Sequence, residues 1–252
     1  MNGWLIYDDA QFAANQWFAE QLLRAGSSFS SFTLISAQEL AFGLSGEKIL
    51  FFLRGEQVSP PNFAVVRTIF PLLSEMLEKA GVRVFNRAEI ARICNDKRLT
   101  YAAMLSARVP VLPTAFCDRR FFDIRTIAAF DYPLVLKSAS GHGGTEVFLL
   151  KTEKELLAAV SALPADAFLL QKLLEPSGRD LRVYVLGGRI LGAVMRSSDG
   201  FRSNHSLGGK VAPYRLGAAE TQLVQRVLVA LPCQPDFVGV DLLPAENGYW
   251  FN

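Results

Sequence analysis

The sequence predicts an α/β protein in which a small doubly wound domain precedes a second domain of a different pattern. Short apolar strands alternate with helical patterns over about the first 90 residues, which is typical of a parallel sheet between helices. Beyond residue 92 the pattern changes to paired strands joined by glycine-containing turns. The chain has 252 residues, and half of them are hydrophobic. That is enough for one large domain or two ordinary ones.

The first domain is expected over residues 1–92. A buried strand at 4–8 precedes a helix at 10–25 that Gly26 ends, and a second helix over about 70–80 ends at Gly81. The other strands are short apolar runs, assigned to the same parallel layer. They are expected at 32–35, 48–53, 63–66 and 82–85.

The second domain is expected over residues 93–252. Asp96 is expected to cap a helix that runs to about residue 107, and two prolines then keep residues 109–114 extended. Gly187 and Gly188 mark a hairpin turn. The other elements are predicted from apolar runs between turn residues. Helices are expected at 120–130, 152–162 and 217–231, and strands at 133–137, 146–150, 168–174, 181–186, 189–194, 237–243 and 249–251.

The overall charge argues against some classes of partner. The chain carries 26 basic and 24 acidic residues, a net charge of +2, which gives no electrostatic basis for binding nucleic acid or an anionic membrane. No apolar stretch has the length of a membrane span, and the N-terminal acids come too early for a signal peptide. The three scattered cysteines predict neither a zinc site nor disulfides. We therefore expect a cytoplasmic protein.

A lysine beside a glycine loop is the first sign of chemistry. Lys137 ends an apolar run, and Gly141, Gly143 and Gly144 lie in the loop that follows. Glycines let backbone N–H groups approach phosphate oxygens, and a lysine supplies a point charge. Taken alone, such a lysine is more often solvated surface, and such a loop is more often a hairpin turn.

Further polar residues accompany the loop in a fixed order. Arg182 lies within an apolar strand, where it either pairs with Asp180 or Glu175 or faces a phosphate-binding cleft. Asp241 lies between two apolar residues, and a buried carboxylate there needs either a bound cation or a salt bridge. The motifs, in chain order, are Asp96-Lys97-x-x-Thr100, the loop after Lys137, Gln171–Glu175, Asp180-x-Arg182, Arg202-Ser203-Asn204 and Gly239-x-Asp241.

This ordered series resembles the ATP-grasp enzymes, and specifically the RimK-type carboxylate–amine ligases that include alpha-L-glutamate ligases. The resemblance covers the chain from about residue 90 to its end. It implies a small pre-ATP-grasp α/β domain at 1–92 and an ATP-grasp core at 93–252. Within the core it implies a smaller lobe at 93–170, which carries the phosphate loop, and a partial larger lobe at 171–252.

The resemblance also implies a role for each motif residue. Lys97, Lys137 and the loop glycines would contact the phosphates of ATP. Arg182 and Arg202 would be catalytic, stabilising the acyl phosphate and the tetrahedral oxyanion. Asp241 and Asn252 would bind the metal. The other nucleotide-binding positions are Gln171, Lys172 and Leu173 at adenine, Asp180 at ribose, and Arg202, Ser203 and Asn204 near phosphate.

The implied chemistry explains these residue types. Such ligases transfer the γ-phosphoryl group of ATP to a carboxylate, and an amine then attacks the acyl phosphate. Lysines, arginines and Mg²⁺, or Mn²⁺ in its place, stabilise the crowded negative charge. Mg²⁺ prefers the hard oxygens of carboxylates and amides. The substrates would be small-molecule or peptide carboxylates and amines; neither their identity nor the oligomeric state follows from the sequence.

The last strand departs from the family pattern. Family members place one or two further acids there, whereas this strand is Gly248-Tyr-Trp-Phe-Asn252. Asn252 is either the start of a segment whose acids are absent or the metal-binding asparagine in a shifted register. We therefore expect an ATP-grasp core truncated at its C-terminus, or a degenerate paralogue. Besides the RimK-type ligase, two alternatives stay open: a different ATP-grasp chemistry, such as a lysine-biosynthesis-like or peptide-modifying ligase, and a nucleotide-binding pseudoenzyme or interaction module of the same fold.

Overall fold

The computed structural model describes residues 1–141, 144, 146–201 and 209–252. The chain forms two compact units, Met1–Arg92 and Ile93–Asn252. Each unit combines β-sheets with helices, which confirms the mixed α/β class. No helix in the described part of the chain is long and apolar enough to span a membrane.

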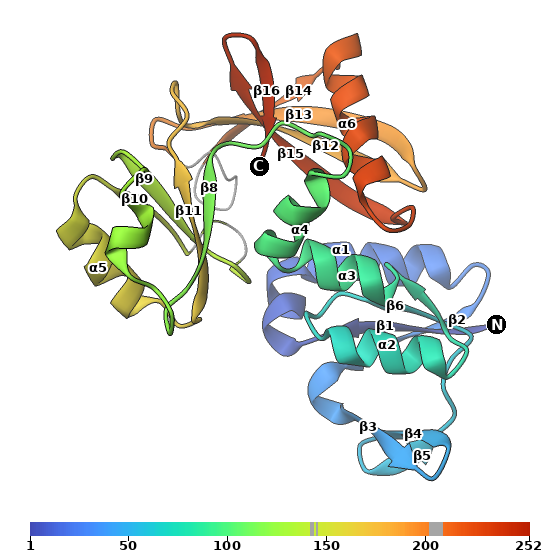
Figure 1. Ribbon diagram of the computed structural model, residues 1–252. Helices are drawn as coiled ribbons and strands as arrows, with labels where there is room; N and C mark the ends of the chain where they lie inside the picture. The colour runs from blue at the N-terminus through green and yellow to red at the C-terminus, as the bar shows by residue number, and fades with distance from the viewer. Residues whose placement is uncertain (142–143, 145, 202–208) are drawn as a thin grey trace. The chain divides into compact units, whose positions relative to one another are not determined.

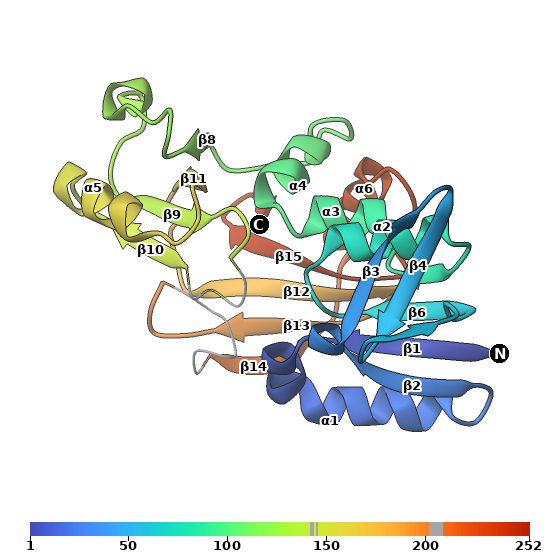
Figure 2. The same cartoon turned by 90° about the horizontal axis from the view of Figure 1, so that it is seen from below.

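The first unit contains a parallel four-stranded sheet between helices (Figures 1 and 2). Helix α1 covers one face and α2 the other. Alternate residues of the first strand enter the two cores: Trp4 and Ile6 pack with residues of α2, while Leu5 and Tyr7 pack with residues of α1. This is the predicted doubly wound layer. Its elements are β1 (Asn2–Tyr7), α1 (Asp9–Gly26), β2 (Ser31–Ser36), β6 (Phe63–Val66), α2 (Pro71–Lys79) and β7 (Arg83–Phe85), in the sheet order β2-β1-β6-β7.

One predicted strand of this unit belongs to a different sheet. Residues 48–53 form a strand as expected, but its assignment to the parallel layer is wrong, because it pairs antiparallel in a separate three-stranded sheet. The physical reason is the connection: β3 and β4 are joined through Gly46 and Glu47 alone, whereas parallel neighbours need a dozen or more connecting residues. The elements here are η1 (Ala37–Glu39), β3 (Leu40–Ser45), β4 (Lys48–Leu53) and β5 (Glu56–Val58).

The first sheet of the second unit has the order β10-β9-β11-β8 and is antiparallel throughout. Helix α5 packs on it, and Leu156 and Val160 of the helix share a core with Leu136 and Phe168 of the strands. The helix predicted at 120–130 is wrong in length: it is one 3₁₀ turn, because Asp123 caps it only at Ile124. Helix α3 (Ala88–Cys94) spans the boundary between the two units. The elements of this part of the second unit are α4 (Lys97–Met104), β8 (Thr114–Asp118), η2 (Ile124–Ile127), β9 (Leu134–Ser138), β10 (Val147–Leu150), α5 (Glu153–Ala162) and β11 (Ala167–Lys172).

The second sheet of this unit has five antiparallel strands in the order β14-β13-β12-β15-β16. Its strands alternate between two faces. Leu181, Val183 and Leu242 are fully buried among apolar residues, whereas Arg182 and Asp241, on the alternate positions, face each other across the β12–β15 pair. The elements are β12 (Arg179–Leu186), β13 (Arg189–Ser197), β14 (Lys210–Tyr214), α6 (Ala218–Ala230), β15 (Phe237–Ala245) and β16 (Gly248–Phe251).

Candidate nucleotide-binding site

A cavity of about 560 Å³ lies in the second unit, lined by strands of both sheets and by residues of α4 and α6. Every predicted site residue that the structure describes lines this cavity. These residues are Lys97, Lys137, Gly141, Gly144, Gln171, Lys172, Leu173, Asp180, Arg182, Asp241 and Asn252. Four others, Gly143, Arg202, Ser203 and Asn204, lie outside the described residues. The structure therefore brings together residues that are more than 150 positions apart in the sequence.

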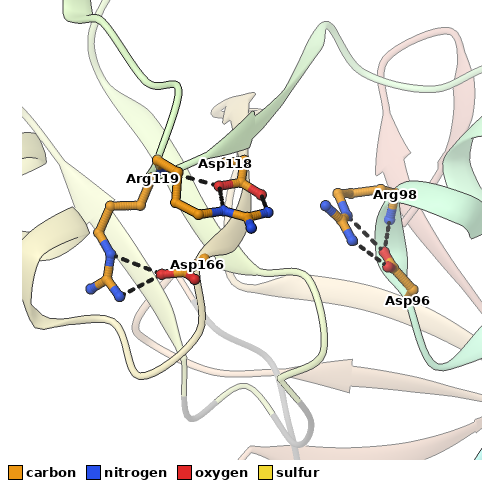
Figure 3. Close-up of polar contacts among 6 residues, drawn as sticks. Asp96, Arg98, Asp118, Arg119 and Asp166 are labelled. Carbon is orange, nitrogen blue, oxygen red and sulfur yellow. Dashed lines mark hydrogen bonds and ion pairs between the residues drawn. The ribbon is translucent and has the colours of Figure 1, made fainter.

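The start of α4 positions Lys97. Asp96 caps the helix as predicted: its Oδ1 accepts from the backbone N–H of Arg98 at 2.8 Å, and the Arg98 guanidinium also binds the same carboxylate (Figure 3). The ammonium of Lys97 then donates to the carbonyl oxygens of Ser138, at 3.0 Å, and Gly141. Burial lowers the pKa of Lys97. The ammonium of Lys97 thus lies at the start of the glycine loop, beside the end of β9 and near Lys137.

Lys137 is held by amide oxygens from two sheets. Its Nζ donates to Oε1 of Gln171 at 2.8 Å and to Oδ1 of Asn252 at 2.5 Å. Gln171 is oriented in turn because its Nε2 donates to the hydroxyls of Tyr101 and Thr114. Burial, together with the charge of Lys97, lowers the pKa of Lys137 to about 7. Lys137 is therefore a half-buried amine whose two described hydrogen-bond partners, Gln171 and Asn252, are both neutral.

Two carboxylates and two arginines form a network on the cavity face of the five-stranded sheet. Arg182 pairs with Asp241, and neither Asp180 nor Glu175, the partners considered from the sequence, contacts it. Arg196, which the sequence analysis did not assign, binds both oxygens of Asp180 and also donates to Oδ1 of Asp241 at 2.9 Å. Burial acts to lower the pKa of Arg196, but its bonds and charges with Asp180 and Asp241 outweigh burial and raise it.

Asp180, which the resemblance places at the ribose, is paired with an arginine in this structure. Its side chain is buried, and both its oxygens accept hydrogen bonds from Arg196. The contact with ribose stays a prediction, whereas the ion pair is observed. The backbone N–H of Lys172, a predicted adenine contact, likewise has a partner within the protein: it donates to the carbonyl oxygen of Pro113 at 3.1 Å. The predicted adenine contacts of Gln171, Lys172 and Leu173 also stay predictions.

Comparison with known proteins now assigns the family. Residues 96–252 match the RimK-like ATP-grasp domain, which is more than half of the chain. The chain belongs to the RimK-like ATP-grasp family. It is 33% identical over 213 residues to beta-citrylglutamate synthase B of Mus musculus, covering 78% of this chain and 54% of that protein. It is 35% identical over 180 residues to N-acetylaspartylglutamate synthase A of Homo sapiens, covering 68% of this chain and 45% of that protein.

Solved structures agree on the fold. A RimK domain ATP-grasp protein from Sphaerobacter thermophilus superposes with a TM-score of 0.72 at 21% identity, covering 100% of this chain and 89% of that one. D-alanine–D-alanine ligase from Bacillus anthracis, complexed with ATP, gives a TM-score of 0.75 at 13% identity, covering 100% of this chain and 84% of that one. These likenesses confirm an ATP-grasp fold for the whole chain. The chain spans about half the length of the curated relatives it matches.

The metal-binding residues predicted for this ATP-grasp core are neighbours: Asp241 lies on β15, and Asn252 directly follows the adjacent strand β16. The backbone N–H of Asn252 donates to the carbonyl oxygen of Asp241 at 3.0 Å. Within the described residues there is no group of three or more His, Cys, Asp or Glu side chains that could hold a metal. Mg²⁺ that arrives with ATP needs only one or two protein oxygens beside the phosphates, so a carboxylate and an amide oxygen fit it. The roles of Asp241 and Asn252 at a metal stay predictions.

Proposed function

We propose that this chain carries the active site of an ATP-dependent carboxylate–amine ligase, which forms an amide bond through an acyl phosphate. The observation that carries the proposal is the convergence of Lys97, Lys137, Arg182 and Asp241 on one cavity, in a chain of the RimK-like ATP-grasp family. Two half-buried lysines in one cavity, both with lowered pKa, are costly without an anion. A polyphosphate is an anion that repays this cost.

The nucleotide would lie along the cavity with its base among apolar side chains and its phosphates at the lysines. Met104, Val227 and Leu231 are among the apolar residues that line the cavity. Gly141 also lines the cavity, and a Cβ there would lie 2.8 Å from Oε2 of Glu146, so that the Glu146 side chain would have to move. Gly144 has a φ of +78°, which glycine adopts without strain. Glycines at these two positions would let backbone N–H groups approach the phosphates.

The protein's own groups would bind and orient the reacting phosphate. Lys137 exchanges its two amide partners for phosphate oxygens, and Arg182 lies on the same sheet face, where the acyl phosphate would form. Bound Mg²⁺ would be held by Asp241 and Asn252, and it would neutralise phosphate charge. Such positioning and electrostatic stabilisation are the main requirements of phosphoryl transfer. Arg202 is assigned the same role as Arg182, from the resemblance.

Glutamate is the first amine to test. The names of the curated relatives beta-citrylglutamate synthase B, N-acetylaspartylglutamate synthase A and a probable alpha-L-glutamate ligase of Haemophilus ducreyi all contain it. We extend this to the present chain as a proposal: an amino acid or peptide amine joined to a small carboxylate. A cytoplasmic location, where ATP and amino acids are present together, belongs to the same proposal.

The test measures nucleotide binding and turnover in matched variants. Lys97→Met and Lys137→Met each remove one charge-assisted contact, worth about 1.5–3 kcal/mol, and each is expected to weaken Mg-ATP binding by about tenfold or more in calorimetric titration. Lys151→Met, at an exposed lysine of the same unit, is the control. The wild type is expected to release ADP with L-glutamate and at least one of a panel of small carboxylates. Binding of ATP without ADP release in any combination would favour the pseudoenzyme.

A further inference from the structure

The four charges around Asp241 differ in how firmly they are held. Arg196 and Asp180 are buried, with relative exposures of 7% and 2%, and Arg196 binds Asp180 through both Nε and Nη2. The Arg182 side chain is one-third exposed, and only its Nη1 is bonded to Asp241, at 3.0 and 3.2 Å. One arginine is thus fixed by a second carboxylate, whereas the hydrogen bonds described for the other go to Asp241 alone.

From this asymmetry we propose that Asp180 and Arg196 form a positioning pair that fixes the carboxylate of Asp241 through Oδ1, and that Arg182 is the partner of Asp241 that a divalent cation displaces. The inference rests on the proposed function, because it takes Asp241 as a metal ligand. It gives Asp180 a role that differs from contact with a ribose.

The strand pairing fixes the pair in place. Asp180 is directly opposite Arg196 on β13, and Arg182 is directly opposite Asp241 on β15. Because β12 supplies both Asp180 and Arg182, the four side chains lie on the same face of three adjacent strands. Nη2 of Arg196 reaches both Asp180 and Asp241, so that a single guanidinium connects β12 and β15.

The charges explain why Asp180 is needed. Arg196 is shared between two carboxylates, so only part of its attraction acts on Asp241. Without Asp180, a buried guanidinium would have Asp241 as its only carboxylate partner among these four residues, and a buried charge pairs as fully as it can. Asp241 would then be neutralised by Arg196 and less able to bind a cation. The positioning pair thus orients the Asp241 carboxylate without neutralising its negative charge completely.

Arg182 has the opposite properties. Its guanidinium lies over Gly239, where a Cβ would be 2.6 Å from Nη2, and it is 5.8 Å from the ring centroid of Tyr184, which is itself partly exposed. Arg182 is therefore partly solvated and lies over an aromatic face that attracts cations, and both would stabilise its charge once it leaves Asp241. A released Arg182 would be free to meet the acyl phosphate.

The experiment uses Mn²⁺ as the metal probe and ADP as the nucleotide, on the full chain. Mn²⁺ binding in the presence of ADP is followed by electron paramagnetic resonance, and ADP binding in EDTA is followed by calorimetry. Asp180→Asn is expected to weaken Mn²⁺ binding by at least tenfold and to leave ADP affinity in EDTA within twofold. Arg182→Met is expected to tighten Mn²⁺ binding several-fold, because it removes the competing cation.

Two further variants keep the test decisive. Arg196→Lys keeps the buried charge, and hence the fold, but loses the planar fork that reaches both carboxylates, so it is expected to weaken Mn²⁺ binding at least threefold. Asp118→Asn is the matched control. Asp118 pairs with Arg120 at a surface position of the same unit, and this variant is expected to match the wild type (Figure 3). Thermal melts establish that each variant is folded.

The outcomes separate this inference from the proposed function. If Asp180→Asn or Arg196→Lys holds Mn²⁺ as tightly as the wild type, or if Arg182→Met weakens it, the positioning pair or the displacement is overturned and the ligase proposal stands. If Asp180→Asn loses ADP affinity equally in EDTA, Asp180 contacts the nucleotide and the pair is again overturned. A wild type that binds ADP but holds no Mn²⁺ with it contradicts the metal role of Asp241, on which both proposals depend.

Discussion

Substituting Gly239 by alanine tests the position of Arg182 without removing any charge. A Cβ at this position would lie 2.6 Å from Nη2, 2.8 Å from Nε and 2.9 Å from Cζ of Arg182. Ordinary contact needs about 3.5 Å, so the guanidinium must move by about 1 Å. The bonds from Nη1 to Asp241, now 3.0 and 3.2 Å, would then exceed hydrogen-bond length. The same Cβ would also keep the guanidinium away from the sheet face where the acyl phosphate would form, and a displacement of about 1 Å at a catalytic group lowers turnover by about 100-fold.

The sheet supplies a matched control for this variant. Tyr184 is paired with Gly239 on one side and with Gly192 on the other, and a Cβ at Gly192 would meet no atom within 4 Å. Neither glycine has a left-handed φ, so alanine suits the backbone of both. The free energies of unfolding of both variants are expected to lie within about 1 kcal/mol of the wild-type value, because the Arg182–Asp241 ion pair is partly exposed and contributes little to stability. ADP release is measured with L-glutamate and the carboxylate that the wild type accepts. Equal turnover of the two variants would refute the assigned position of Arg182.

Three further predictions follow from single residues. The pKa of Lys137 in the folded protein is about 7, well below that of an ordinary lysine. Between these two pH values the unfolded chain therefore binds more protons than the folded one, so the free energy of unfolding increases with pH. It should rise by about 2 kcal/mol from pH 7 to 9, as measured by urea titration. Lys137→Met should abolish this rise, and Lys151→Met should keep it. Gly178→Ala should destabilise more than Gly187→Ala in thermal melts: both have positive φ, but only at Gly178 does a Cβ meet a backbone atom, at 2.2 Å from the carbonyl oxygen of Gly200. Thr152→Ala should cost about 1 kcal/mol in urea unfolding, because the Thr152 hydroxyl caps α5; a cost near zero would contradict the cap.

Elements that local signals specify were predicted well from the sequence. The paired strands β12 and β13 follow from their alternating pattern and the turn at Gly187 and Gly188, and the capped start of α4 follows from Asp96. Strands without such signals were missed. Sheet edges are one case: β14 contains Pro213, and a proline within a short run argues against a strand unless the strand lies at an edge. The edge position is a tertiary property that the local sequence does not carry.

Arg196 was missed for a related reason. Counting outward from the two-residue turn, Leu186 faces Arg189, and the same register would place Asp180 opposite Met195. A β-bulge between Tyr184 and Val185 shifts the pairing by one residue and brings Arg196 opposite Asp180 instead. A shift of one residue exchanges the two faces of a strand. The arginine that completes the candidate site thus depends on a backbone irregularity for which the sequence has no local signal.

The two faces of the five-stranded sheet show how one set of strands serves both stability and chemistry. On one face, Leu181, Val183 and Leu242 are buried among apolar residues. On the other, Asp180 and Arg196 are almost as deeply buried but charged. Replacing a buried ion pair with apolar residues of similar volume is often neutral or stabilising, so stability alone does not account for these charges. They are better explained by the bond from Arg196 to Asp241, the carboxylate at which the proposed metal would bind, with Asp180 holding Arg196 in place.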